Sequence, residues 1–493
     1  LSGQLSGNGG LTKAGSGTLE YSVANTYTGP TTVTTGTLQL DVGGTSSSVL
    51  HLANGAMLNL NYSGTRVVPG LYTNGVALPV GTYTSSNLGG FITGSGNLQV
   101  ASSISTGLWT GAGADNNWST AGNWDQNAVP VFPIGLTFAG STRLTNNNDL
   151  SSITASSITF DAAAGAFDLN GDDITLAGNI GFNGNPTAPV TQTINLNMAW
   201  SPASLNVNTP TNGNLVLGGN VTSAADYSLN KTGAGTLTMG GINSIAGMGV
   251  NGGTNIITGN TTINGNGDGN DRFYLGDGDL LSGCNGTLVI QPGAVLGVTG
   301  SFGDTFVIGR DGGSGTVIQN GGTFTFNPAS VIPIVVGATS ATNTRAEYDM
   351  NGGLLDMSGN SLWVGLGDNG VTMTGVVNQV SGDIANVFEL DLGAVRAFGK
   401  GVYTLSGGSI TIDFGGIITD NGLYAINLGG GTVAASSSWS SSLNMNLTNL
   451  NGSVTFNPAG NTITLSGVLS GKGGLTVAGG GTLEFAVANT STG

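Results

Sequence analysis

The end of this chain repeats its beginning. Residues 1–29 and 465–493 align without a gap, and they differ only at Gln4, Asn8, Lys13, Ser16, Tyr21, Ser22 and Tyr27 of the first copy. A single compact domain has no reason to return to its first residues 464 positions later, whereas a tandem array of stacked units does. We therefore expect a segment of a longer repetitive protein that continues upstream, in which neither end is a polar cap.

A second repeat runs through the later half of the chain. Gly309, Gly337, Gly365 and Gly393 follow one another at a constant 28-residue step, and each ends a short apolar run. Apolar residues alternate with polar ones, as in the stretch 38–40, which is the period of half-buried strands. The pattern predicts an all-β fold, a β-solenoid or parallel β-helix with about three short strands per coil. A propeller or a set of sandwiches is the alternative, but a 28-residue period is too short for a four-stranded blade.

These patterns divide the chain into five predicted regions. A weaker copy of the first motif, LNKTGAGTLTMGG, lies at residues 229–241 and favours one architecture throughout. The predicted regions are a β-solenoid repeat at 1–103, a Trp-rich connecting segment at 104–150, a β-solenoid at 151–263, a β-solenoid with 28-residue repeats at 264–435, and a β-solenoid that re-enters the next tandem copy at 436–493.

Composition narrows the possible functions. Charged residues make up 7% of the chain, the formal net charge is −16, and 89 glycines accompany only 13 prolines. Clustered Lys and Arg, which a nucleic acid or an anionic membrane requires, are missing from the sequence. The 38% hydrophobic content argues against disorder, and the low proline content argues against collagen. Cys284 is the single cysteine, so no internal disulfide can form.

Three segments resemble a known family. The stretch GNGGLTKAGSGTLEYSVANTYTGPTTVTTGTLQL at 7–40 resembles the autotransporter-associated β-strand repeat of bacterial surface proteins, and WTGAGADNNWSTAGNW at 109–124 and FDLNGDDITLAGNI at 167–180 are similar to segments of such proteins. The resemblance implies a right-handed parallel β-helix that is exported to the surface of a Gram-negative-type bacterium and acts as a passenger or repetitive adhesin. It supplies no catalytic residues.

One polar run is a candidate metal site. Oxygen-bearing side chains alternate with glycine after residue 263, as in the first half of a calcium loop, but Leu275 stands where the bidentate Glu should be. A solvated turn is the alternative interpretation, and we expect no other cofactor. The candidate ligands are Asn264, Asn266, Asp268, Asn270, Asp277 and Asp279.

Other candidate sites have simple structural alternatives. Trp109, Trp118 and Trp124 could stack on sugar rings, but they are also the natural core of a small lobe. Polysaccharide-cleaving β-helices use carboxylates on one strand face together with a basic group. The carboxylate pairs are Asp172/Asp173, Asp277/Asp279 and Glu389/Asp391, and the nearby basic residues Arg310, Arg345 and Arg396 lie at different phases of the repeat. His51 and Cys284 have no partner of metal-binding or catalytic type and are predicted to be structural.

The sequence therefore predicts a structural protein and not an enzyme. We expect an extracellular or cell-surface fibre or stalk segment whose partners are adjacent copies of itself, head to tail, with no nucleic acid and no membrane insertion. A glycan-binding adhesin that contacts surface or extracellular polysaccharide is the first alternative. A polysaccharide lyase or hydrolase of β-helix type is the second.

Overall fold

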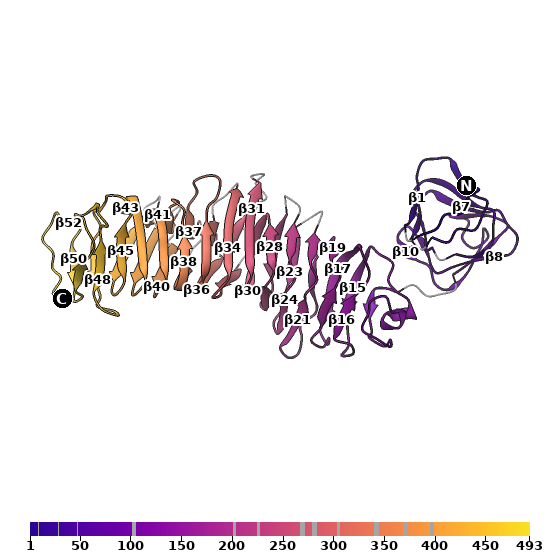
Figure 1. Ribbon diagram of the computed structural model, residues 1–493, viewed down its shortest axis with the longest axis horizontal. Coiled ribbons are helices and arrows are strands. Elements are labelled where there is room, and N and C mark those ends of the chain that lie inside the picture. The colour runs from indigo at the N-terminus through magenta and orange to yellow at the C-terminus, as the bar shows by residue number, and fades with distance from the viewer. Residues whose placement is uncertain are drawn as a thin grey trace. The chain divides into compact units, whose positions relative to one another are not determined.

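The computed structural model describes the chain except residues 8, 28, 47, 101–104, 201–203, 224–226, 267–271, 279–282, 303–305, 340–344, 368–372 and 395–398. The chain divides into two compact units, unit 1 (Leu1–Ala155) and unit 2 (Ser156–Gly493). Within the described residues the regular structure is almost entirely strand, with two short 3-10 turns, η1 (Ala121–Asn123) and η2 (Asp125–Asn127) (Figure 1). No helix in this described part is long and apolar enough to span a membrane.

The chain up to Val100 forms a coil with three faces. Its strands are β1 (Leu11–Lys13), β2 (Thr18–Tyr21), β3 (Thr31–Val33), β4 (Gly36–Leu40), β5 (Gly44–Thr45), β6 (Leu50–Leu52), β7 (Ala56–Leu60), β8 (Thr65–Val68), β9 (Leu71–Thr73), β10 (Val76–Ala77), β11 (Gly81–Tyr83), β12 (Ile92–Gly94) and β13 (Asn97–Val100). The parallel ladders β1-β3-β6-β9, β2-β4-β7-β12 and β5-β8-β13 are the three faces. The chain passes once around the coil between β4 and β7, where Gly36 aligns with Ala56 and Leu38 with Leu58.

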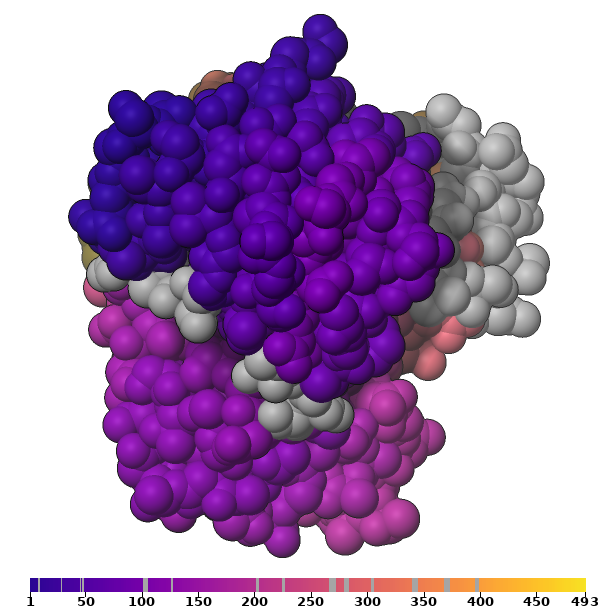
Figure 2. Space-filling view, turned by 90° about the vertical axis from the view of Figure 1, so that its right-hand side faces the viewer, coloured from indigo at the N-terminus to yellow at the C-terminus, as the bar shows by residue number. Residues whose placement is uncertain are grey.

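Strand alternation explains the core of this coil. Leu38 and Leu40 point inward and are buried, whereas Gln39 between them is half-buried at the outer face. The outward Gln39 accepts a hydrogen bond from Asn59 of the next coil at 3.0 Å, so polar side chains also stack from one coil to the next. In Figure 2 the residues of this unit, in indigo and violet, form a closed surface on the face in view.

The remainder of unit 1 is a small aromatic lobe. It contains β14 (Leu108–Trp109), η1, η2, β15 (Ile134–Phe138) and β16 (Thr145–Asn148). β14 and β15 pair in parallel, and Trp109 forms an antiparallel bridge with Trp124. This lobe corresponds to the Trp-rich stretch that the sequence sets apart from the repeats.

Unit 2 is itself a three-faced coil of parallel ladders (Figure 1). The first face holds β18 (Asp168–Gly171), β21 (Val190–Ile194), β24 (Gly213–Leu217), β27 (Thr236–Met239), β30 (Gly252–Ile257), β33 (Asn285–Ile290), β36 (Ser314–Phe326), β38 (Arg345–Asp356), β40 (Met373–Gln379), β42 (Gly399–Leu405), β44 (Leu423–Leu428), β47 (Met445–Leu447) and β50 (Leu469–Gly471). The second face holds β19 (Ile174–Leu176), β22 (Met198–Trp200), β25 (Val221–Ser223), β28 (Ile242–Ile245), β31 (Asn260–Asn266), β34 (Val295–Ser301), β45 (Thr432–Ala435), β48 (Val454–Asn457) and β51 (Leu475–Val477). The third face holds β17 (Ile153–Asp161), β20 (Ile180–Asn183), β23 (Leu205–Asn208), β26 (Ser228–Thr232), β29 (Gly247–Val250), β32 (Phe273–Asp277), β35 (Phe306–Arg310), β37 (Ile334–Thr339), β39 (Leu362–Gly367), β46 (Trp439–Ser441), β49 (Thr462–Leu465) and β52 (Thr482–Phe485).

Several long strands bend from one face to the next. β36 and β38 carry their second halves onto the second face, and β41 (Asp383–Leu392) and β43 (Ser409–Ile418) run from the second face to the third. Register shifts mark the bends, for example between Gln319 and Asn320 in β36 and between Ile384 and Val387 in β41. The predicted parallel β-helix with about three strands per coil is therefore confirmed.

Stacked apolar columns fill the interior. On the third face Phe306 aligns with Ile334, which aligns with Leu362 and then Leu390, and all four are buried. Phe273 stacks on Phe306 with ring centroids 3.7 Å apart and an interplanar angle of 6°. Each fully buried side chain of this size contributes about 1.5–3 kcal/mol relative to an exposed one. Because every coil supplies one layer of the column, each layer is the surface on which the next one packs.

The glycines of the 28-residue repeat bend the main chain near the ends of third-face strands, within β35, β37 and β39 and directly after β41. Gly309, Gly337, Gly365 and Gly393 have φ of 71°, 88°, 77° and 75°, a region that other residues occupy at a cost. At Gly365 a Cβ would also collide with the carbonyl oxygen of Lys400 in the neighbouring coil. The regular glycine spacing in the sequence therefore corresponds to a bend of the main chain that recurs once per coil.

Candidate functional site

A buried lysine holds the corner of the first repeat. The Lys13 ammonium donates hydrogen bonds to the carbonyl oxygens of Gly15 at 2.6 Å, Thr35 at 2.9 Å and Ala14 at 3.3 Å. Gly15 has φ of 80°, a left-handed backbone conformation, and its carbonyl oxygen faces the Lys13 ammonium. Thr35 belongs to the next coil, so the ammonium joins two successive coils at one corner.

The weaker copy of the motif has the same arrangement. The Lys231 ammonium donates to the carbonyl oxygens of Thr232 and Gly233, each at 2.9 Å, and to that of Gly252 at 2.8 Å. Gly233 has φ of 77°. Gly252 again lies in the next coil. We call each arrangement a lysine cradle: one buried Nζ that donates to three main-chain carbonyls, the third of which comes from the coil that follows.

The two cradles are equivalent in their strand pairing. Lys13 aligns with Val33 and Lys231 with Val250, and in both cases the third carbonyl is two residues beyond that partner. Burial lowers the pKa of Lys231 to about 7, while the three carbonyl oxygens act in the opposite direction because they favour the charged form. These lysines are not among the candidate residues predicted from the sequence. The available signal was a lysine at an inward position of an alternating strand in both motifs.

The three tryptophans of the lobe are buried. Trp109 and Trp118 each meet Trp124 edge to face, with centroids 5.1 and 5.9 Å apart. The indole N–H of Trp124 donates to the carbonyl of Trp118 at 2.7 Å, and that of Trp118 donates to the side chain of Asn146 at 2.8 Å. The rings therefore pack on one another and on Phe138 as the core of the lobe. They have no face on the surface for a sugar to stack on, so their burial does not support the glycan-stacking hypothesis.

The candidate calcium ligands lie only partly within the described residues. Asn264 is an exposed residue of β31, and Asn266 ends that strand. Asp277 is buried on β32, where its N–H donates to the side chain of Asn251 at 3.2 Å. Asp268, Asn270 and Asp279 lie outside the described residues. In the part of the chain that is described, no three His, Cys, Asp or Glu side chains come together as a metal site, and calcium binding stays a prediction.

The carboxylate pairs are placed differently from one another. Asp172 and Asp173 are exposed after β18, and Asp173 accepts from Asn197 at 2.9 Å. Asp279 of the second pair lies outside the described residues. Glu389 in β41 accepts from Ser361 Oγ and from Trp363 Nε1, both at 3.1 Å.

Asp391 is the buried member of the third pair. It is buried in β41 between Trp363 of one neighbouring strand and Ile418 of the other. Burial raises the pKa of Asp391 to about 7, with further contributions from the negative charges of Asp420 and Glu389. Among the described residues no donor reaches its Oδ1.

Of the basic residues, Arg310 lies beside one of these pairs, because it aligns with Asp277 of the neighbouring strand β32. Arg310 forms an ion pair with Asp311 at 2.9 Å, and Arg345 forms one with Glu347 at 2.8 Å. Both pairs link close neighbours in sequence, and Arg396 lies outside the described residues.

His51 and Cys284 occupy structural positions. The His51 ring lies parallel to the ring of Tyr72 in the next coil, 4.4 Å away, and partial burial lowers the pKa of His51. Cys284 is a buried free thiol, and burial raises its pKa. A thiol with a raised pKa is a poor nucleophile because little thiolate forms at neutral pH.

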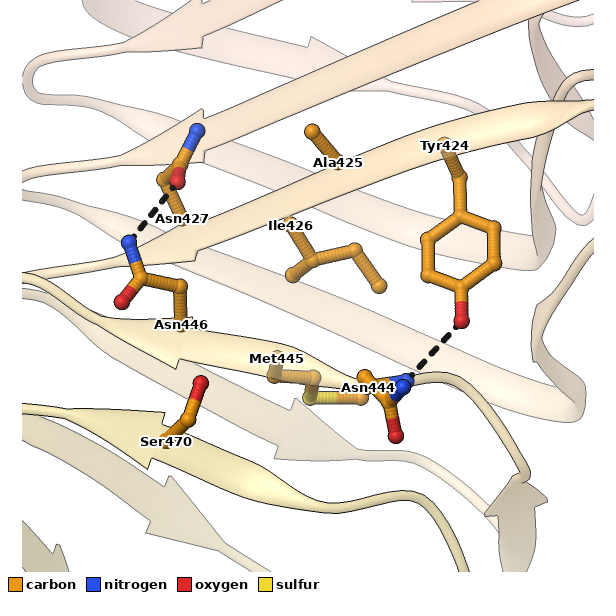
Figure 3. A pocket seen from close by; sticks show the side chains of 8 residues that line it. All are labelled: Tyr424, Ala425, Ile426, Asn427, Asn444, Met445, Asn446 and Ser470. Atoms are coloured by element: carbon orange, nitrogen blue, oxygen red, sulfur yellow. Dashed lines mark hydrogen bonds between the residues drawn. The ribbon is translucent and has the colours of Figure 1, made fainter. Parts of the chain in front are cut away.

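A shallow hollow opens on the first face near the end of unit 2 (Figure 3). β44 and β47 pair only at Asn427 with Asn446 and at Leu428 with Leu447, so the strands separate toward Tyr424. The Asn446 amide donates to Asn427 at 3.2 Å, and the Asn444 N–H donates to the Tyr424 hydroxyl at 3.2 Å. The space is about 290 Å³ and is lined by Tyr424, Ala425, Ile426, Asn427, Asn444, Met445, Asn446 and Ser470. Its lining is uncharged and combines an aromatic ring with amide and hydroxyl groups.

Comparison with known proteins agrees with this geometry. Residues 11–40 and 229–254 match the family described as Passenger-associated-transport-repeat. These two segments contain the two lysine cradles from the lysine to its last carbonyl, Lys13 to Thr35 and Lys231 to Gly252. In this chain each matched segment therefore contains one cradle together with the part of the following coil that supplies its third carbonyl.

One curated relative covers nearly the whole chain. The chain is 28% identical over 567 residues to a protein named Adhesin BmaC autotransporter, from Brucella suis biovar 1 (strain 1330). The alignment includes 95% of this chain but only 16% of the relative. No solved structure matches. The predicted likeness to autotransporter-associated repeat proteins of the passenger type is confirmed, and with it an extracellular or cell-surface location.

Proposed function

We propose that this chain is a stalk segment of a large tandem-repeat surface protein, in which the coils of one copy stack end to end on those of the next. The observation that carries the proposal is the layered interior of unit 2. There each buried residue of a column packs on its equivalent one coil away, as Phe306, Ile334 and Leu362 do. Such a coil can be extended by adding layers without any change in design.

The outer faces support the same proposal. Amide and hydroxyl side chains form hydrogen bonds from coil to coil, for example Asn195 to Asp168 at 2.8 Å and Asn378 to Asp349 at 2.9 Å. These rows of polar side chains keep the surface hydrated with few charged groups, and they add contacts between successive coils.

Electron microscopy of the native surface protein tests the stalk. We expect continuous rods with layers about 4.8 Å apart. Gly365→Val should interrupt the rod, because φ at this position is 77° and the new side chain meets Lys400. Gly480→Ala is the matched control, since a Cβ there has open space and the first copy has Ser16 at the equivalent position. Strings of separate globules in the unaltered protein would contradict the proposal.

A second function, adhesion to a polysaccharide, is favoured by the hollow beside Tyr424. Sugars are bound through aromatic faces and through planar amides that both donate and accept hydrogen bonds. Tyr424, Asn444 and Asn446 present these groups next to one another. The relative is also named as an adhesin.

Binding of the whole chain to immobilised bacterial and host polysaccharides tests this second function. Tyr424→Ala and Asn446→Ala should each weaken binding at least fivefold. Asn206→Ala is the matched control, because Asn206 lies in a similar amide pair with Asn230 far along the coil. Binding that survives both hollow variants, or that falls equally with the control, excludes the hollow as the site.

A further inference from the structure

The two nearly identical end segments fold in the same way in different surroundings. β1 and β51 have equivalent bounds, and so do β2 and β52, at the same offset in numbering that separates Leu5 from Leu469. Leu5 N–H donates to the Asn25 side chain at 2.7 Å, and Leu469 N–H donates to Asn489 at 2.8 Å. The matching main-chain bonds, from Thr26 and Thr490 to those same leucines, are both 2.9 Å long. The two copies therefore share these strands and contacts, although residues 469–471 form β50 and the equivalent residues 5–7 are not in a strand.

The two copies of this coil are paired on opposite edges. In the first copy β1 and β2 pair with the coil that follows them, through Leu11 with Thr31 and Leu19 with Leu38. In the second copy β51 and β52 pair with the coil that precedes them, through Ile463 with Leu483 and its neighbours. Taken together, the two copies show how this coil pairs with the coil before it and with the coil after it.

Burial of equivalent residues changes accordingly. Tyr21 is 3% exposed beneath the following coil, whereas its equivalent Phe485 is 44% exposed. On the other edge Leu1 is 49% exposed, whereas its equivalent Leu465 is 1% exposed above the preceding coil. An apolar side chain that is exposed in one copy is thus covered in the other by a coil of this same sequence.

From these observations we infer the docking surface and its occupant: the open edge of β51 and β52 is covered by residues 30–62 of a further copy of this sequence. The register is that of β1 with β3 and of β2 with β4, so Leu475 aligns with the copy's Thr31, Leu483 with its Leu38, and Glu484 with its Gln39. The inference rests on the proposed stalk and specifies the joint between copies. In this joint residues 465–493 serve as residues 1–29, and the next copy continues from Pro30.

The joint differs from an ordinary layer in two ways. In the first copy the Tyr21 hydroxyl bonds to that of Tyr27 at 3.1 Å, and Tyr27 bonds in turn to Thr31 of the next coil at 2.5 Å. The second copy has Phe485 and Ser491 at these places, so both members of the hydroxyl pair change together. Val477 replaces the cradle lysine as well, which makes the joint an apolar contact.

A disulfide trap tests the register. We would extend the full chain after Gly493 with a second copy of residues 30–103, and introduce Glu484→Cys with Gln39→Cys in the added segment. Directly aligned positions are within disulfide range, whereas positions two residues apart are about 7–8 Å apart. We expect oxidation of this pair to exceed at least fivefold that of the control pair Glu484→Cys with Thr37→Cys, which shares the same outer face. Equal oxidation of both pairs overturns the register.

Hydrogen exchange gives a second readout that needs no cysteine. Amides of residues 475–485 should exchange at least tenfold more slowly in the extended chain than in the chain that ends at Gly493, because the added coil covers their edge. Unchanged exchange overturns the docking surface. Continuous rods in native material together with unchanged exchange would reject this joint and leave the stalk standing, whereas separate globules in native material would reject the stalk itself.

Discussion

Two coils of unit 2 each bury one ionisable side chain, and they treat it in opposite ways. Lys231 has three carbonyl acceptors around its ammonium, one of them from the next coil. Asp391 lies within its strand ladder with acidic neighbours, and among the described residues no donor reaches its Oδ1. A buried polar group stabilises a fold when its hydrogen bonds are complete and costs free energy when they are not.

The contrast separates the features that define the architecture of a coil from those that change its stability. Both coils have the same three faces and the same apolar columns, so neither charge is needed for the architecture. We expect the lysine to strengthen the contact between two particular coils, and the aspartate to make another contact sensitive to pH. In a solenoid each layer touches only its neighbours, and we therefore expect both effects to be local.

Of the changes that test this contrast, removal of Lys231 should have the largest effect on the stability of its coil. Lys231→Met keeps the length of the side chain but removes three hydrogen bonds to buried carbonyls, of which that of Thr232 also accepts from the Thr209 N–H at 3.1 Å. The loss should destabilise the local coil by about 2–4 kcal/mol. The measurement is hydrogen exchange of β26 and β29 at pH 6, where the ammonium is intact. The matched control Lys472→Met removes an exposed lysine and should change stability by less than about 0.5 kcal/mol. Equal effects of the two variants would mean that the cradle does not hold the coils together.

The aspartate should give a smaller effect that depends on pH. The pKa of Asp391 is raised from an ordinary value of 3.8 to about 7, so the folded protein holds this proton over a pH range in which the unfolded chain has lost it. The contribution of this group is therefore fully present below about pH 4 and is lost as pH rises toward and through 7. We expect the coil around β41 to lose about 1–3 kcal/mol between pH 4 and pH 8.

The measurement is hydrogen exchange of β41 and β43 across this pH range, corrected for the intrinsic exchange rate. Asp391→Asn keeps the shape and cannot ionise, so its profile should be flat. Asp173→Asn, at an exposed carboxylate, is the control that should leave the slope of the native protein unchanged. A slope that persists in Asp391→Asn would assign the pH dependence to another group.

Much of this fold could be predicted from the sequence, because a regular repeat of residues corresponds to a regular repeat of strands. The 28-residue spacing of Gly309, Gly337, Gly365 and Gly393 indicated the repeat length of the coil, and alternation indicated the half-buried strands. The lysine cradles could not be predicted in this way, since their third acceptor is a carbonyl of the following coil whose direction depends on coil register. The hollow beside Tyr424 likewise arises where β44 and β47 separate, and no residue spacing in the sequence marks that separation.

The smallest expected effect comes from moving the cradle to a place that lacks it. Val477 occupies the position of Lys13 and Lys231, and the following Gly479 has φ of 69°, so the corner already has the shape that a cradle uses. In the chain extended by residues 30–103, Val477→Lys should find the carbonyls of Ala478, Gly479 and the added Thr35.

We expect this variant to stabilise the extended chain by about 1 kcal/mol, as one further set of hydrogen bonds to a charged group would. In the chain that ends at Gly493 the third carbonyl is missing and position 477 is open to solvent, so the same variant should change stability by less than about 0.5 kcal/mol. Thermal unfolding of the four chains measures the difference. A gain that is equal with and without the added coil would mean that the lysine acts within its own coil, and the cradle would then be a corner support and not a link between layers.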